Sequence, residues 1–99
     1  MKKILLVCNA GMSTSMLVAK MKTAAQADGV EVSIEAKSLA DAKKEIQEAN
    51  IVLLGPQIRY ELENVKQLAG SVPVEAIDMR DYGMMNGEKV LKHAMEVMG

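Results

Sequence analysis

The sequence has very few of the residues on which several common functions depend. It contains one cysteine, Cys8, in 99 residues, which excludes an internal disulfide, a CxxC redox pair and a cysteine-rich zinc site. Its aromatic residues are two tyrosines, too few to build base-stacking platforms or a free sugar pocket. The first apolar run, residues 4–7, is much shorter than a signal-peptide core or a membrane span. We therefore expect a cytoplasmic protein with a free thiol and no direct membrane insertion.

The sequence also has no excess of positive or negative charge. Twelve Lys and Arg residues against thirteen Asp and Glu residues give a formal charge of −1, and no basic block could neutralise a row of phosphates. Nucleic acid is therefore not an expected partner. Apolar residues make up 49% of the chain, which is typical of a soluble globular protein with a buried core. At this length we expect one domain over residues 1–99.

Apolar spacing divides the chain into alternating strands and helices. Continuous apolar runs predict buried strands at residues 4–7 and 51–54, alternation predicts a half-exposed edge strand at 30–35, and a fourth strand is expected at 72–77. Helical spacing occupies residues 13–28, 39–48, 58–70 and 90–98, and a short connection spans 78–87. The predicted fold class is α/β, an open four-stranded parallel sheet of order 2-1-3-4 with helices on both faces. Because Glu31 and Glu35 place charge on the edge strand, we expect a monomer.

This strand order predicts where a ligand binds. The chain reverses direction in the sheet between the first and third strands, and open α/β sheets bind ligands at such a point. The loop after the first strand, with Cys8, would meet there the loop after the third strand, which contains Gly55, Pro56 and Gln57. A Gly-Pro pair is also a common way to end a strand, so the second loop is either part of the site or a simple turn.

The loop after the first strand has the composition of an anion cradle. It leads from a strand end into a helix, so successive backbone N–H groups and the helix dipole can hold a phosphate, and no acidic residue precedes Asp28. The same field favours the thiolate of Cys8, which makes Cys8 a candidate nucleophile as well as a candidate packing residue. The candidate phosphate-binding loop consists of Asn9, Ala10, Gly11, Met12, Ser13, Thr14 and Ser15.

Cysteine loops of similar form occur in low-molecular-weight tyrosine phosphatases, in which an arginine follows the cysteine after five residues. Thr14 stands at that arginine position here, and the sequence contains no Asp-Pro general acid. Without the bidentate cation, neutral donors alone would stabilise the charge of the transition state. The loop is therefore better suited to holding a phosphoryl group than to hydrolysing it.

Three separated blocks give the whole chain a resemblance to a known family. The blocks are residues 6–15, residues 52–58, and a C-terminal group with Tyr82, Gly83, Gly87, Val90 and Leu91. In these blocks the chain resembles the IIB components of bacterial sugar phosphotransferase systems, in the lactose, cellobiose and diacetylchitobiose group.

The resemblance implies a phosphotransferase that uses no cofactor and no metal. It implies that Cys8 takes a phosphoryl group from a phosphohistidine of a IIA protein and passes it to a disaccharide bound by the membrane IIC permease. The chain would then act as a separate subunit, transiently at the inner face of the membrane. Two rival interpretations are a phosphatase-like enzyme and a non-catalytic module in which Cys8 only packs.

Other polar residues have competing structural interpretations. His93 is the sole histidine and can be paired with the cysteine, but its position within a charged helical stretch favours a solvated helix face. Asp78 is a candidate general acid or the cap of the next helix. Tyr60 and Tyr82 can either seal the sheet edge or contact a partner.

The nine methionines are mostly expected to fill the core at helical spacing, and we expect this of Met16 and Met21. A partner must nevertheless cover the cysteine loop closely. We therefore expect Met12, together with Met84 and Met85, to rim that loop with apolar surface.

Overall fold

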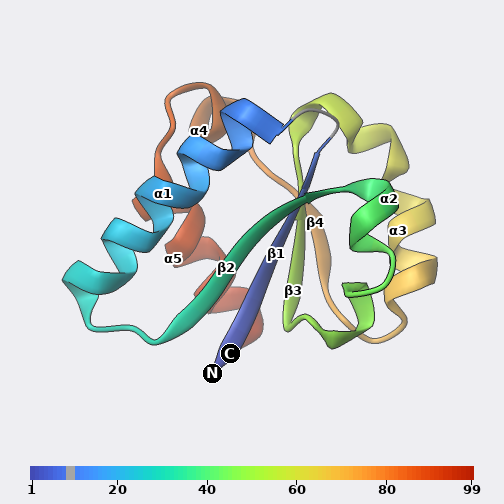
Figure 1. Ribbon diagram of the computed structural model, residues 1–99, viewed down its shortest axis with the longest axis horizontal. Coiled ribbons are helices and arrows are strands. Elements are labelled where there is room, and N and C mark those ends of the chain that lie inside the picture. The colour runs from blue at the N-terminus through green and yellow to red at the C-terminus, as the bar shows by residue number, and fades with distance from the viewer. Residues whose placement is uncertain (9–10) are drawn as a thin grey trace.

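A four-stranded parallel sheet forms the centre of the molecule (Figure 1). The structure is a computed structural model that describes residues 1–8 and 11–99, with side chains for residues 1–8 and 14–99. The strands follow the order β2-β1-β3-β4, with β1 at Lys2–Cys8, β2 at Val32–Ser38, β3 at Ile51–Leu54 and β4 at Val74–Ala76. The predicted strand order and the edge position of the second strand are both confirmed.

Helices cover both faces of this sheet (Figure 1). One face carries α1 (Gly11–Asp28), α4 (Met79–Gly83) and α5 (Gly87–Met98). The other face carries α2 (Leu39–Ala42), the short 3₁₀ helices η1 (Ile46–Glu48) and η2 (Pro56–Glu61), and α3 (Leu62–Ala69). Among the described helices, none combines the length and apolar character needed to cross a membrane.

The pleat of β1 divides the apolar core into two layers. Ile4 and Leu6 pack against α1 and α5, whereas Leu5 and Val7 pack against the helices of the other face. All four are 0% exposed, because β1 lies between two neighbouring strands and is covered on both sides. This arrangement explains why the strand reads as a continuous apolar run.

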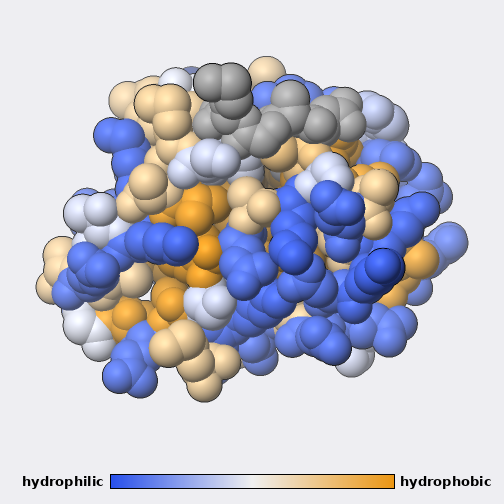
Figure 2. Space-filling view, viewed as in Figure 1, coloured by the Kyte–Doolittle hydropathy of each residue, from blue (hydrophilic) through white to orange (hydrophobic). Residues whose placement is uncertain are grey.

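The edge strand β2 has a different environment. Ile34 faces the core, while Glu35 is exposed, so the alternation predicted for this strand is present. An open depression runs between α1 and β2, and its apolar lining includes Val18, Ile34 and Ala36. Figure 2 shows this hydrophobic strip between hydrophilic side chains.

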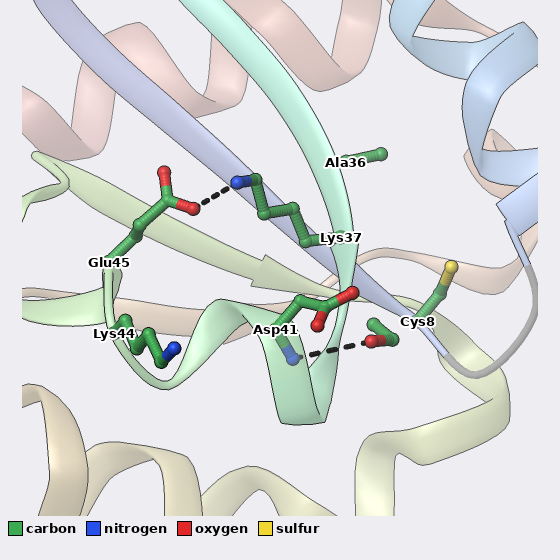
Figure 3. Close-up of a pocket in the computed structure, with 7 residues that line it drawn as sticks. Cys8, Ala36, Lys37, Asp41, Lys44 and Glu45 are labelled. Carbon is green, nitrogen blue, oxygen red and sulfur yellow. Dashed lines mark hydrogen bonds and ion pairs between the residues drawn. The ribbon is translucent and has the colours of Figure 1, made fainter.

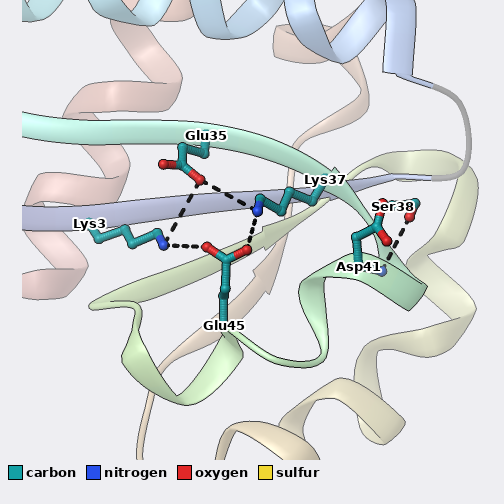
Figure 4. Close-up of polar contacts among 6 residues, drawn as sticks. All are labelled: Lys3, Glu35, Lys37, Ser38, Asp41 and Glu45. Atoms are coloured by element: carbon teal, nitrogen blue, oxygen red, sulfur yellow. Dashed lines mark hydrogen bonds and ion pairs between the residues drawn. The ribbon is translucent and has the colours of Figure 1, made fainter.

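The helix expected at residues 39–48 is broken into two short pieces. Ser38 caps α2 as predicted, since its Oγ accepts a hydrogen bond of 3.3 Å from the Asp41 N–H. The α-helix ends at Ala42, and η1 begins only after Glu45. At that residue the carboxylate of Glu45 binds lysines from β1 and β2, which draws the chain toward the sheet (Figure 4).

Two other expectations need correction. Met16 is 58% exposed, although its spacing placed it in the core with Met21, which is 0% exposed. The buried stripe of α1 runs instead through Leu17, Val18 and Met21, and Met16 lies beyond its border. The fourth strand begins at Val74 rather than at residue 72, because Pro73 has no N–H to donate to a neighbouring strand.

Candidate functional site

The carboxyl ends of β1 and β3 bring Cys8 beside the loop that follows β3. The Gly55 N–H donates a hydrogen bond of 2.8 Å to the Val7 carbonyl oxygen. A Cβ added at Gly55 would lie 3.3 Å from the Cβ of Cys8. The backbone of Gly55 therefore packs against Cys8, and the carboxyl ends of β1 and β3 lie side by side.

Cys8 lies at the wall of an open hollow next to β2. The cysteine is 2% exposed, and the pleat directs it to the same face of the sheet as Ile4 and Leu6, toward α1. The hollow, here called the Cys8 hollow, has a volume of about 440 Å³. Its lining residues, drawn in Figure 3, are Cys8, Ala36, Lys37, Ser38, Asp41, Lys44 and Glu45. Its two lysines are matched by two carboxylates, so the hollow carries no excess of positive charge.

A cluster of four charged side chains borders the Cys8 hollow (Figure 4). One carboxylate oxygen of Glu45 lies 2.6 Å from the Lys3 amine, and the other binds the Lys37 amine. Glu35 lies 3.9 Å from Lys3 and 4.0 Å from Lys37. The hydrogen bond from Lys3 holds the pKa of Glu45 below its usual value, and Glu45 in turn raises the pKa of both lysines. Lys37 is thus directed to Glu45 (Figure 3).

The predicted phosphate-binding loop is described only in part. Asn9 and Ala10 lie outside the described residues, as do the side chains of Gly11, Met12 and Ser13. The helix begins at Gly11, two residues earlier than expected, so its N-terminus follows Cys8 closely. Its first turn contains no acidic residue, which favours an anion at this end of the helix.

A buried tyrosine connects three segments around the site. The hydroxyl of Tyr82, on α4, lies 3.0 Å from Thr14 Oγ1 at the start of α1, and it accepts a hydrogen bond of 3.2 Å from Gln57 Nε2. Tyr82 is 8% exposed and Thr14 is 0% exposed. Thr14 belongs to the predicted phosphate-binding loop, and its hydroxyl contacts Tyr82 in this structure. Ser15, the next residue of that loop, is exposed.

The role of Tyr82 could not be predicted from the sequence. The tyrosine lies 68 residues from Thr14 along the chain, so no local pattern connects the two. The one signal was its place in the third block of the family resemblance. Tyr60, by contrast, is 72% exposed and lies on η2.

Two candidates from the sequence have structural roles away from Cys8. Asp78 Oδ1 accepts hydrogen bonds from the N–H groups of Arg80 at 2.8 Å and Asp81 at 3.3 Å, which makes it the cap of α4. His93 is exposed on α5, as expected, and its Nε2 lies 2.5 Å from Glu75 Oε1 on β4. The carboxylate of Glu75 raises the pKa of His93 above its ordinary value of 6.5.

The His93–Glu75 pair should make folding weakly pH-dependent. A raised pKa means that the folded protein holds the proton more tightly, so the added stability is fully present below about pH 6.5 and is lost as pH rises through the folded pKa. Since both side chains are largely solvated, we expect the pair to contribute less than about 1 kcal/mol to the free energy of unfolding. The free energies of unfolding of the wild type and His93→Gln, measured in urea, should differ more at about pH 6 than at about pH 8.5. Equal differences at both values would contradict this assignment.

Solved structures with the same fold include sugar phosphotransferase components. The chain superimposes on the cellobiose-specific IIB protein of Borrelia burgdorferi with a TM-score of 0.81 and 38% identity, covering 98% of this chain and 91% of the other. It superimposes on the lactose-specific IIB domain of Streptococcus pneumoniae with the same TM-score of 0.81 over 96% and 95% of the two chains. At 17% identity, that second match supports the fold alone.

Similarity in sequence extends over the whole chain. It is 44% identical to the oligo-beta-mannoside-specific EIIB component of Bacillus subtilis, over 99% of this chain and 97% of that protein. It is also 44% identical to galactose-specific and cellobiose-specific EIIB components of Lactococcus lactis, each over 98% of this chain and 96% of the relative. The profile of the lactose/cellobiose-specific IIB subunits matches residues 3–93. The chain therefore belongs to the lactose/cellobiose-specific IIB subunits of the sugar phosphotransferase system, whose EIIB components are phosphotransferases.

Proposed function

We propose that this protein carries a phosphoryl group on Cys8 between a IIA protein and a sugar bound by a membrane IIC permease. The observation that carries the proposal is the position of Cys8 in a IIB chain, at the carboxyl end of β1 between the Gly55 backbone and the N-terminus of α1. In this position the thiolate can reach a phosphoryl group that the loop and the helix hold. The reaction takes place in the cytoplasm, at the inner face of the membrane.

Two transfers make up the proposed relay. In the first, the Cys8 sulfur attacks the phosphorus of a phosphohistidine, the N–P bond breaks, and its electron pair returns to the imidazole of IIA. In the second, a sugar hydroxyl oxygen attacks the phosphorus, the S–P bond breaks, and the electron pair returns to sulfur while the hydroxyl releases its proton. Both are in-line displacements that depend mainly on positioning and charge stabilisation.

The proposed anion site uses neutral donors. Backbone N–H groups of the loop from Asn9 to Ser15 would hold the phosphoryl oxygens, with the dipole of α1 behind them. The opposite wall would be formed by Gly55, Pro56 and Gln57. The Tyr82 hydroxyl would hold the side chains of Gln57 and Thr14 in position through its hydrogen bonds. Because no arginine stands in the loop, the site should hold phosphate without hydrolysing it quickly.

The sugar is proposed to be selected outside this chain. Relatives with oligo-beta-mannoside, galactose and cellobiose in their names are all 44% identical to it. Equal similarity to components for different sugars supports a division of labour in which the IIC permease selects a disaccharide of the cellobiose, diacetylchitobiose or lactose class.

The proposal is tested by loading the protein with phosphate. The wild type would be incubated with phosphoenolpyruvate, the general phosphotransferase proteins and its IIA protein, and then analysed by intact mass and peptide mapping. We expect one phosphate on the Cys8 peptide, and none when IIA is omitted. No phosphate on Cys8 with active partners would overturn the relay. Hydrolysis of an aryl phosphate by the protein alone would instead support the phosphatase interpretation.

Removal of the Tyr82 hydroxyl should affect both stability and transfer. In Tyr82→Phe the buried hydroxyl of Thr14 loses its partner, which costs about 1–3 kcal/mol. Gln57 also loses its anchor, so phosphorylation of Cys8 should slow by about tenfold. Urea unfolding and the initial rate of phosphate loading measure the two effects. Tyr60→Phe is the matched control, since Tyr60 is 72% exposed, and identical behaviour of the two variants would refute the role of Tyr82.

A further inference from the structure

Both arginines of the chain line one hollow at the carboxyl end of β4. Arg59 comes from η2, which follows β3, and Arg80 comes from the first turn of α4, which follows β4. The hollow, here called the arginine hollow, has a volume of about 450 Å³ and is also lined by Pro56, Ala76, Ile77, Asp78 and Met79. Two cations that are 21 residues apart in sequence thus share one open surface.

The charge of the arginine hollow is not balanced. Of the residues that the structure describes, no carboxylate lies within 4.0 Å of either guanidinium. Asp78 is the one acidic residue in its lining, and its Oδ1 already accepts two backbone hydrogen bonds as a helix cap. Arg59 Nη1 lies 3.9 Å from the sulfur of Met79. The hollow therefore differs from the Cys8 hollow, in which lysines and carboxylates are equal in number.

The arginine hollow lies at the same edge of the sheet as the proposed phosphoryl site, because β1, β3 and β4 are parallel neighbours whose carboxyl ends share that edge. Pro56 begins η2 and lines the hollow, and it directly follows Gly55, which packs against Cys8. Large apolar side chains are exposed on the same segments, with Met79 at 65% and Tyr60 at 72%. A protein that docks over the carboxyl ends of β1, β3 and β4 would cover Cys8 and both arginines, in a surface that combines apolar contact with positive charge.

We propose that Arg59 and Arg80 are a docking anchor for a carboxylate-bearing segment of the phosphorylated IIA protein. The inference rests on the proposed function, because it needs a donor that approaches Cys8. Guanidinium groups bind carboxylates through paired hydrogen bonds, and two of them on separate elements fix the direction of approach. Ion pairs at an exposed rim affect how fast the two proteins meet and how they are oriented, rather than the chemical step at the reacting atoms. Their effect should therefore appear in the KM for phosphorylated IIA.

The test measures initial rates of Cys8 phosphorylation against the concentration of phosphorylated IIA. In the double variant Arg59→Gln/Arg80→Gln we expect the KM to rise about tenfold while kcat changes less than about twofold. The KM of the variant should also depend less on salt than that of the wild type, because the lost contacts are ionic. Arg59→Lys/Arg80→Lys keeps the charge and should recover part of the loss.

A matched control removes two other exposed cations. Lys66→Gln/Lys92→Gln, on α3 and α5, makes the same change in net charge and should leave the KM for IIA unchanged. An equal rise in KM in this control would show a general charge effect and overturn the anchor. All variants should unfold at the same urea concentration, since these side chains are exposed.

Other outcomes separate this proposal from the relay itself. An unchanged KM for IIA, or a fall in kcat alone, would overturn the anchor while leaving phosphorylation of Cys8 intact. A normal KM for IIA with impaired transfer to sugar would assign the arginines to the IIC permease and overturn the proposal as stated. If wild-type Cys8 takes no phosphate from IIA, the relay fails, and the anchor fails with it.

Discussion

Cys8→Ser abolishes sugar phosphorylation in the proposed relay, with an expected loss of at least about 10³-fold. A serine hydroxyl is a poor nucleophile without an adjacent base, and a serine phosphate, once formed, is a stable ester that is a poor donor to sugar. The substitution is nearly isosteric at a residue that is 2% exposed, so the fold should survive with a cost of about 1 kcal/mol for the buried hydroxyl.

Three measurements distinguish loss of chemistry from loss of folding. Peptide mapping after incubation with IIA reports the phosphate, urea unfolding reports the fold, and sugar uptake in cells that lack the wild-type protein reports function. We expect uptake to fail in a folded Cys8→Ser protein. Intact uptake would mean that Cys8 only packs, and it would reopen the interpretation of the chain as a non-catalytic module.

Gly87→Ala should have the largest effect on stability among the predicted variants. A Cβ at this residue would lie 2.6 Å from the carbonyl carbon of Lys20 and from the backbone nitrogen of Met21. These are backbone atoms of α1, so they cannot rotate away as the end of a long side chain can. The helices α1 and α5 would have to separate, and we expect a loss of about 3 kcal/mol.

The effect of Gly87→Ala should extend to phosphoryl transfer, because α1 carries its N-terminus and Thr14 to the site. Gly83→Ala is the matched control, since a Cβ at Gly83 meets nothing within 4 Å and its φ is not positive. The control should unfold at the wild-type urea concentration or slightly above it. Similar midpoints for Gly87→Ala and Gly83→Ala would rule out the close contact between α1 and α5.

Local patterns were sufficient to predict the sheet. The apolar run at residues 51–54 coincides with β3. The alternation in residues 30–35 predicted the edge strand, which the structure places slightly later, at Val32–Ser38. The same reasoning was wrong for Met16 and for the helix at residues 39–48. In both cases contacts with other parts of the chain determine the structure. The direction in which α1 packs leaves Met16 exposed, and the binding of Glu45 to Lys3 and Lys37 accompanies the break in the helix.

In the candidate site, too, some contacts could be predicted from the sequence and others could not. The meeting of Cys8 with Gly55 follows from parallel strands whose carboxyl ends share one edge, so it could be predicted from sequence. The junction of Tyr82 with Thr14 and Gln57 could not, because it joins side chains from three elements whose packing no local pattern describes.

The sequence by itself determined the order of strands and helices and the candidate nucleophile, because apolar periodicity and loop composition are local properties of the chain. Only the tertiary structure decided which helix faces meet, that Tyr82 bridges the site, and that Arg59 and Arg80 share one hollow. These contacts join residues far apart in the chain, and packing of the two core layers against the sheet brings them together.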